Sequence, residues 1–141
     1  MGMLGAVVAG GIIGVASREL LLLPFTTDAA TPAAVLGVAA VTMGINVLGS
    51  FVLGIVVGTL ADRHPLARAF IGTGVLGGFT TYSAFALHTA SFLGSVPAVG
   101  VVLAVGSVLL GLAAAALGLR LTRRGGAAGS GSAPGQPETA R

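Results

Sequence analysis

Cysteine and charged residues are what this chain of 141 residues most lacks. It contains no cysteine, which excludes disulfides, thiolate metal sites and cysteine nucleophiles. Only 8% of the residues are charged, roughly a third of the ~25% typical of a soluble domain, whereas 55% are hydrophobic. A water-soluble globule of this size could not cover so much apolar surface. The composition therefore argues against soluble enzymes and nucleic-acid-binding modules, and it indicates a membrane protein.

Lysine is also absent, so the positive charge comes from seven arginines, which with four acidic residues give a formal net charge of +3. The isoelectric point of about 11.2 reflects these few arginines in a nearly uncharged chain rather than a basic, nucleic-acid-binding face. The mean hydropathy of +1.02 agrees with a membrane location.

Four apolar stretches, separated by polar or proline-containing turns, are long enough to cross a bilayer, which takes about 20 residues. The first is too long for the apolar core of a signal peptide and has no basic segment before it, so we interpret it as a span. The sequence predicts an all-α membrane protein with four transmembrane helices. Their predicted ranges are 3–23, 33–61, 66–93 and 98–121.

The domain organisation follows from composition. Residues 1–122 form a single membrane domain, and residues 123–141 form a tail rich in glycine, alanine, serine and proline. The tail contains no aliphatic or aromatic side chain larger than alanine, so we predict that it is disordered.

Glycine pairs spaced four residues apart lie inside the spans. Helices in lipid associate through close approach at small residues, so we expect these pairs to mark packing surfaces. Four short helices enclose little space, and we expect a transport path to need more than one chain. The pairs are Gly10 and Gly14, Gly54 and Gly58, and Gly74 and Gly78.

Polar side chains in a bilayer are costly, so their positions are informative. Arg18 lies near the end of the first span beside Glu19; it is either an interfacial residue or a fixed positive charge at the mouth of an anion path. Asn46 lies near the middle of the second span. Its amide can form an interhelical hydrogen bond or donate to a dehydrated anion. The residues alone leave these alternatives open.

The third span has the densest polar group. Gly77 and Gly78 are followed by Thr80 and Thr81, and this combination favours a break in the helix. Broken backbone is tolerated at membrane depth only where protein or a cavity satisfies its polar groups. Its freed carbonyls resemble the cation sites of discontinuous transporter helices.

Enzyme chemistry finds little support in the remaining polar residues. Tyr82 and Phe85 share a helix face, as core packing residues also do. Ser107 is the polar outlier of the fourth span, where a serine commonly bonds back to its own helix. Because the spans contain no nucleophilic triad, carboxylate pair or metal-ligand cluster, and both histidines stand alone, we expect no enzyme activity.

Three motifs occur in order along the four spans. They are Gly10-Gly11-x-x-Gly14-x-x-x-Arg18, Asn46-x-x-Gly49-x-Phe51-x-x-Gly54, and Gly-Gly-Phe-Thr-Thr-Tyr-Ser-Ala-Phe at 77–85. Together they resemble the Fluc (CrcB-type) fluoride channels over residues 5–121. The resemblance implies passive exit of fluoride from the cytoplasm through an antiparallel, dual-topology dimer with two pathways along the subunit interface.

The resemblance also implies site residues. A structural sodium ion would lie at the dimer centre, bound by the backbone carbonyls of Gly77 and Thr80. Arg18 would make the vestibule electropositive. Fluoride is small and tightly hydrated, so a selective path replaces its water with dense hydrogen-bond donors and the positive edges of aromatic rings. The implied pathway residues are Asn46, Tyr82, Phe85, Ser83, Thr81 and Ser107.

Three positions depart from the family pattern. Tyr82 stands where the family has phenylalanine, Ala84 replaces a usual threonine, and His88 lies where many members have glutamate. We expect one of the two pathways lined by this chain to be weakened or differently gated.

Two other functions were compatible with a four-span chain. A small multidrug exporter couples protons through a carboxylate inside its first span, but the only candidate, Glu19, lies near the span end beside Arg18. A non-conducting structural subunit would not need Asn46 or the adjacent glycines of the third span. The channel is therefore the preferred interpretation.

Basic residues near the span ends predict orientation in the plasma membrane. Both chain ends and the loop after the second span share one side of the membrane, which holds six arginines, while the opposite side has only Arg18. We expect insertion mainly with both termini in the cytoplasm, and a dimer with either an identical chain or an oppositely oriented paralogue. The six are Arg63, Arg68, Arg120, Arg123, Arg124 and Arg141.

Overall fold

The computed structural model describes residues 2–26, 32–60 and 64–127, and within these ranges the chain is helical apart from short links. Four stretches are long and apolar enough to cross a membrane. They confirm the four predicted spans. Their ranges are Met3–Phe25, Ala34–Leu60, Pro65–Gly94 and Pro97–Arg123.

Three of the four spans are single helices: α1 (Met3–Thr26), α2 (Pro32–Leu60) and α6 (Pro97–Ala127). The third consists of α3 (Pro65–Arg68), the π-helix η1 (Ala69–Leu76), α4 (Gly77–Phe79) and α5 (Tyr82–Ser95). Proline occupies the first position of α2, α3 and α6, where its fixed φ suits a helix and its missing N–H is not needed.

The boundary of the predicted tail lies within α6. This helix continues past Thr122 to Ala127, so the first residues assigned to the tail are helical. Residues 128–141 lie outside the described part of the chain, and their disorder stays a prediction.

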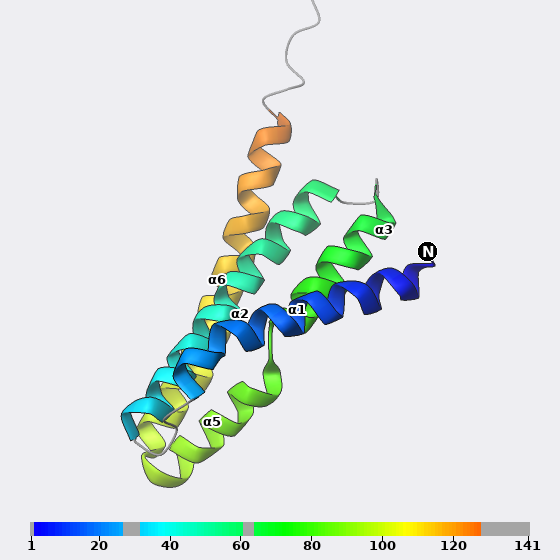
Figure 1. Ribbon diagram of the computed structural model, residues 1–141. Helices are drawn as coiled ribbons and strands as arrows, with labels where there is room; N and C mark the ends of the chain where they lie inside the picture. Colours follow the sequence, from blue (N-terminus) through cyan, green and yellow to red (C-terminus); the bar gives the residue numbers. More distant parts are fainter. Residues whose placement is uncertain (1, 27–31, 61–63, 128–141) are drawn as a thin grey trace, which may run out of the picture.

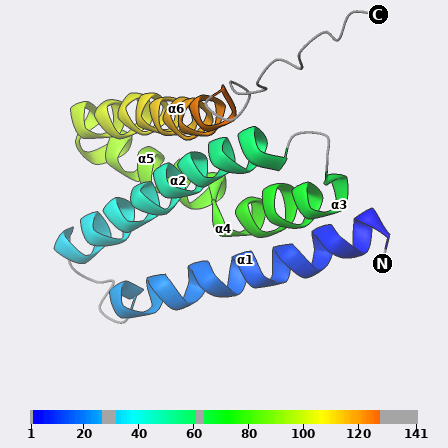
Figure 2. The same cartoon turned by 90° about the horizontal axis from the view of Figure 1, so that it is seen from above.

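The helices form two closely packed groups. α1 packs mainly on η1 and α4, while α6 packs mainly on α2 and also contacts α5. Viewed from above, α2 lies between α1 on one side and α6 on the other (Figure 2). The polar part of the third span is thereby brought against α1 and α2.

Glycines create the seam between α1 and the third span. A Cβ added at Gly10 or Gly14 would overlap a backbone carbonyl of the facing η1 helix. On the facing side of the seam, a Cβ at Gly74 would lie 2.8 Å from the backbone oxygen of Val7 in α1. A Cβ at Gly78 would lie 2.5 Å from the backbone oxygen of Gly11. Backbone therefore touches backbone, as the glycine spacing predicted.

A second glycine seam joins α2 to α6. A Cβ at Gly54 would overlap the Ala115 carbonyl, and one at Gly118 would overlap the Phe51 carbonyl. One turn beyond Gly54, a Cβ at Gly58 would meet the Thr122 hydroxyl. All three predicted glycine pairs thus lie in packing surfaces.

Large apolar side chains face outward on α1, α2, α5 and α6. Only a few apolar side chains are fully buried in the described chain, among them Ile45 and Leu76. This distribution suits a chain surrounded by lipid or by another protein chain rather than by water.

Substituting alanine at a seam glycine tests this packing. We expect Gly54→Ala to lower the stability of the detergent-solubilised protein by ~1–3 kcal/mol, because its methyl group would overlap the Ala115 carbonyl. The measurement is the midpoint of thermal unfolding.

Gly44→Ala on the same helix is the matched control. Nothing lies within 4 Å of a Cβ at Gly44, and alanine favours helix over glycine by ~1 kcal/mol. Its midpoint should be unchanged or higher. Equal midpoints for the two variants would show that the seam does not hold α2 to α6.

Candidate functional site at Thr80 and Thr81

Two residues separate α4 from α5, and we call them the Thr80–Thr81 link. Their backbone is extended, with φ and ψ of −78° and 150° at Thr80 and of −139° and 115° at Thr81. Figure 1 shows the chain passing through this link before α5 begins. The polar backbone groups around it lack regular helix partners, so each needs another partner.

Asn46 binds the link from the middle of α2. The Thr81 N–H donates to the Asn46 Oδ1 at 2.9 Å, and the Asn46 Nδ2 donates to the Thr81 carbonyl at 3.2 Å. The interhelical hydrogen bond, which was one of the two expected roles of Asn46, is therefore present. One side-chain amide replaces both backbone partners that a continuous helix would have given Thr81.

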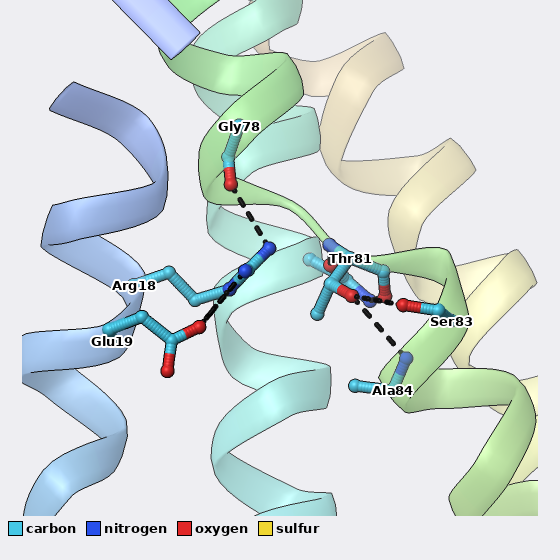
Figure 3. A network of polar contacts seen from close by, with 7 residues as sticks. Arg18, Glu19, Gly78, Thr81, Ser83 and Ala84 are labelled. Atoms are coloured by element: carbon cyan, nitrogen blue, oxygen red, sulfur yellow. Dashed lines mark hydrogen bonds and ion pairs between the residues drawn. The ribbon is translucent and has the colours of Figure 1, made fainter. Parts of the chain in front are cut away.

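Hydrogen bonds within the third span also stabilise the link. The Thr80 N–H and the Thr80 hydroxyl both donate to the Leu76 carbonyl, each at 2.9 Å. On the other side, the Thr81 Oγ1 accepts the Ala84 N–H at 3.3 Å and lies 3.2 Å from the Ser83 Oγ (Figure 3). Thr81 is thus the N-cap of α5, and its hydroxyl points toward the positive end of that helix.

Arg18 approaches the link from α1. Its Nη1 donates to the Gly78 carbonyl at 3.1 Å, while its Nε and Nη2 donate to the Glu19 Oε1 at 3.2 Å and 2.9 Å (Figure 3). The Arg18 side chain is 19% exposed and that of Glu19 is 61% exposed. The positive charge is therefore half-buried beside α4 and paired with a more exposed carboxylate.

The carbonyls of Gly77 and Thr80 are among those near the link that have no hydrogen-bond partner in the described chain. Leu76, Gly78 and Thr81 accept hydrogen bonds from Thr80, Arg18 and Asn46 respectively, whereas no hydrogen bond reaches the carbonyl of Gly77 or Thr80. These two are the residues for which the family resemblance implies sodium binding. A free carbonyl at the carboxyl end of a helix carries partial negative charge.

A cavity of about 340 Å³ lies beside the link. It is bounded by α2, η1, α4, α5 and α6, and it gathers most of the predicted site residues. Ser50, one turn after Asn46 on α2, also lines it and was not predicted. The predicted residues that line the cavity are Asn46, Gly77, Thr80, Thr81, Tyr82 and Ser107.

The other predicted residues lie differently. Ser83 is exposed at the start of α5, and neither it nor Arg18 lines the cavity. The Ser107 Oγ donates to the Ala104 carbonyl at 3.2 Å, the back-bonding expected of a serine in a helix. Phe85 belongs to α5, but its side chain lies outside the described residues, as does that of His88.

Thr42 is a candidate that the sequence interpretation missed. Its side chain is 1% exposed, and its hydroxyl has no hydrogen-bond partner in the described chain. It lies one helical turn before Asn46, on the same face of α2. A buried hydroxyl without a partner costs ~1–3 kcal/mol, so we expect water or a polar ligand to reach it, although Thr42 is not among the residues that line the cavity. The only sequence signal was its four-residue spacing from Asn46.

A family model described as "CrcB-like protein, Camphor Resistance (CrcB)" matches residues 5–119. The chain belongs to the CrcB family. It is 43% identical over 126 residues to a protein of Leifsonia xyli subsp. xyli named fluoride-specific ion channel FluC 2, covering 82% of this chain and 79% of that protein. A protein of Rubrobacter xylanophilus with the same name is 40% identical over 126 residues, covering 88% and 84%.

These relatives confirm the resemblance drawn from the three motifs. Both are named as ion channels, which are not enzymes, in agreement with the expectation for this CrcB protein. With its four apolar helices, the protein is a multi-pass membrane protein.

The buried hydroxyl of this CrcB protein gives a second prediction. Thr42→Val keeps the shape of the side chain and removes a polar atom that has no partner in the part of the chain that the structure describes. We expect unfolding stability to be unchanged or higher by ~1 kcal/mol, while ion flux through the reconstituted protein falls severalfold. Thermal unfolding and flux are measured on the same preparation.

Thr59→Val is the control, because Thr59 lies on the same helix and its exposed hydroxyl donates to the Ile55 carbonyl at 2.8 Å. It should change neither quantity appreciably. Normal flux through Thr42→Val would mean that no transported ion depends on this hydroxyl.

Proposed function

We propose that this protein is a fluoride-selective channel that lets fluoride leave the cytoplasm passively and so lowers its internal concentration. The observation that carries the proposal is the cavity at the Thr80–Thr81 link, where an amide, hydroxyls and a helix N-terminus meet. The relatives named as fluoride-specific channels support it independently.

The donors around the cavity suit a small, strongly hydrated anion. The Asn46 amide has two protons, and the Thr81 carbonyl takes one of them. The second has no partner in the described chain and is available to an anion, so the two roles of Asn46 are compatible. The amino end of α5 adds the positive end of its helix dipole. Such donors would replace the water that fluoride loses on entering.

The proposal includes a third span that is a broken helix in the membrane, with a sodium ion at the break. The Gly77 and Thr80 carbonyls fit such an ion, because neither has a hydrogen-bond partner among the described residues. Gly77 lies in the last turn of the helical run 65–79, and Thr80 directly follows that run. Freed carbonyls of this kind coordinate sodium in discontinuous transporter helices. The bound ion would supply positive charge that fixes the two carbonyls in place.

Two carbonyls are too few to coordinate sodium, so a second chain would complete the site. A dimer partner would also cover surfaces that a single chain leaves open. Tyr82 lines the cavity yet is 81% exposed, and α5 and α6 present large apolar side chains outward. We propose an antiparallel dimer in which both chains contribute to the pathways and to the sodium site.

The fluoride channel is tested by efflux from liposomes. Purified protein should release trapped fluoride, recorded with a fluoride electrode, only when an ionophore balances the charge, because an uncoupled channel moves net charge. Chloride should leave far more slowly, and protein-free liposomes are the control. Equal chloride flux, or strict dependence on a proton gradient as in a multidrug-type exporter, would reject the proposal.

Asn46→Asp tests the pathway. The carboxylate can still accept the Thr81 N–H but cannot donate to the Thr81 carbonyl or to an anion. Its negative charge repels fluoride strongly at low dielectric constant, so fluoride efflux should collapse. Size-exclusion chromatography should show the same oligomer as for the wild type. Normal fluoride efflux through Asn46→Asp would mean that Asn46 forms only the interhelical hydrogen bond and does not bind the transported anion.

Orientation is the remaining part of the proposal. We propose that both termini lie mainly in the cytoplasm, because arginines crowd the membrane side that holds the chain ends. Arg68, Arg120 and Arg123 are exposed there, whereas Arg63 and Arg141 lie outside the described residues. A chain with one fixed orientation needs an oppositely oriented paralogue to form an antiparallel dimer.

Labelling of a single introduced cysteine tests this orientation, since the natural chain has none. Ser132→Cys should react with an impermeant thiol reagent only from the cytoplasmic side of the inner membrane. Ser95→Cys, at the end of α5, should react from the opposite side. Equal labelling of Ser132→Cys from both sides would instead indicate a dual-topology homodimer.

A further inference from the structure

We propose that Arg18 is a positioning residue: its guanidinium holds the carboxyl end of α4 through the Gly78 carbonyl and leaves the Gly77 and Thr80 carbonyls open to a cation. This inference rests on the sodium site of the proposed function. It assigns to Arg18 a role that depends on hydrogen-bond geometry as well as on charge.

Direct backbone contact sets the distance between Arg18 and α4. A Cβ added at Gly14, one turn before Arg18, would overlap the Val75 carbonyl and lie 2.7 Å from the Phe79 nitrogen. A Cβ at Gly78 would lie 2.5 Å from the Gly11 oxygen. Since α1 cannot approach more closely or slide past these glycines, the Arg18 side chain emerges at a fixed height beside Gly78.

The Glu19 carboxylate orients the guanidinium. Its Oε1 accepts from both Nε and Nη2 of Arg18, so the planar group is held by one edge. The remaining Nη1 points to the Gly78 carbonyl at 3.1 Å, as Figure 3 shows. A charged donor on a carbonyl at a helix carboxyl end is stronger than a neutral one, because that end carries partial negative charge.

The result is a division of the carbonyls near the link. Side chains from other helices occupy two of them, Arg18 on Gly78 and Asn46 on Thr81. The carbonyls of Gly77 and Thr80 stay without a partner in the described chain, and both residues line the cavity. If Arg18 released Gly78, a further carbonyl would be free at the end of α4, and the Gly77 and Thr80 carbonyls would no longer be held in position.

A role as a fixed charge and a role as a positioning residue make different predictions. A fixed charge is preserved by Arg18→Lys. Positioning is not, because an ammonium cannot present one planar edge to Glu19 and another donor to Gly78 at the same time. The two roles can be distinguished by the sodium concentration that the protein needs for stability, because this quantity can be measured without any ion transport.

The experiment measures the thermal unfolding midpoint of the purified protein in detergent as sodium chloride replaces N-methylglucamine chloride at constant ionic strength. The sodium concentration that gives half of the stabilisation should rise about tenfold or more in Arg18→Ala, as expected for loss of a hydrogen bond to a charged group. Arg18→Lys should show most of this rise. Arg120→Ala, which removes an exposed arginine near the end of α6, should match the wild type.

Glu19→Gln keeps the Gly78 contact and weakens the orienting pair, so it should raise the sodium requirement less, about two- to threefold. It serves as the decisive variant if Arg18→Ala does not fold. An unchanged sodium requirement in Arg18→Ala, or in Glu19→Gln when that variant decides, would overturn the inference, as would wild-type behaviour of Arg18→Lys. Absence of fluoride efflux from the wild type would instead reject the proposed function. A wild-type unfolding midpoint that does not change with sodium concentration would reject both the sodium site and the role of Arg18.

Discussion

A polypeptide that crosses a bilayer must provide partners for its own backbone, because the hydrocarbon layer offers none. In this protein that requirement is concentrated at the Thr80–Thr81 link, where regular helix hydrogen bonds stop. The Asn46 amide bonds both the N–H and the carbonyl of Thr81, and Arg18 donates to the Gly78 carbonyl. The Thr80 hydroxyl gives the Leu76 carbonyl a second hydrogen bond. The polar residues of three different spans are explained by this need before any transported ion is considered.

The glycine seams make those contacts possible. An asparagine or arginine side chain reaches only a short distance, so it can bind a backbone group on another helix only where the helices nearly touch. The seam of Gly14 and Gly78 brings α1 to α4. Likewise, a Cβ at Gly49, one turn after Asn46, would overlap the Thr80 methyl group, so α2 also lies against the link. Packing and polar chemistry are therefore parts of a single arrangement, in which small residues determine where large polar ones can act.

The sequence was sufficient for features that depend on local pattern. Each span was predicted to within a few residues because apolar runs and prolines bound it, and the glycine pairs marked both seams. Partners distant in sequence could not be predicted, because Arg18 and Gly78 are 60 positions apart and nothing local specifies their contact. Thr42 was missed because threonine in an apolar helix ordinarily bonds to its own backbone, and only the fold shows that its hydroxyl has no partner among the described residues.

The π-helix η1 has a consequence for how the chain tolerates insertions and deletions. A π-helix accommodates extra residues in its wider turns, whereas each residue of an α-helix advances the chain by about 100° around the axis. Deleting one residue from Ala69–Leu76 would return this segment toward α-helical geometry, and the residues after it would keep their direction around the axis. Gly78 would still face α1, and Thr81 would still face Asn46. A deletion within the α-helix α2 would instead rotate the residues after it by about 100°. The third span can therefore absorb the loss of one residue without losing the site.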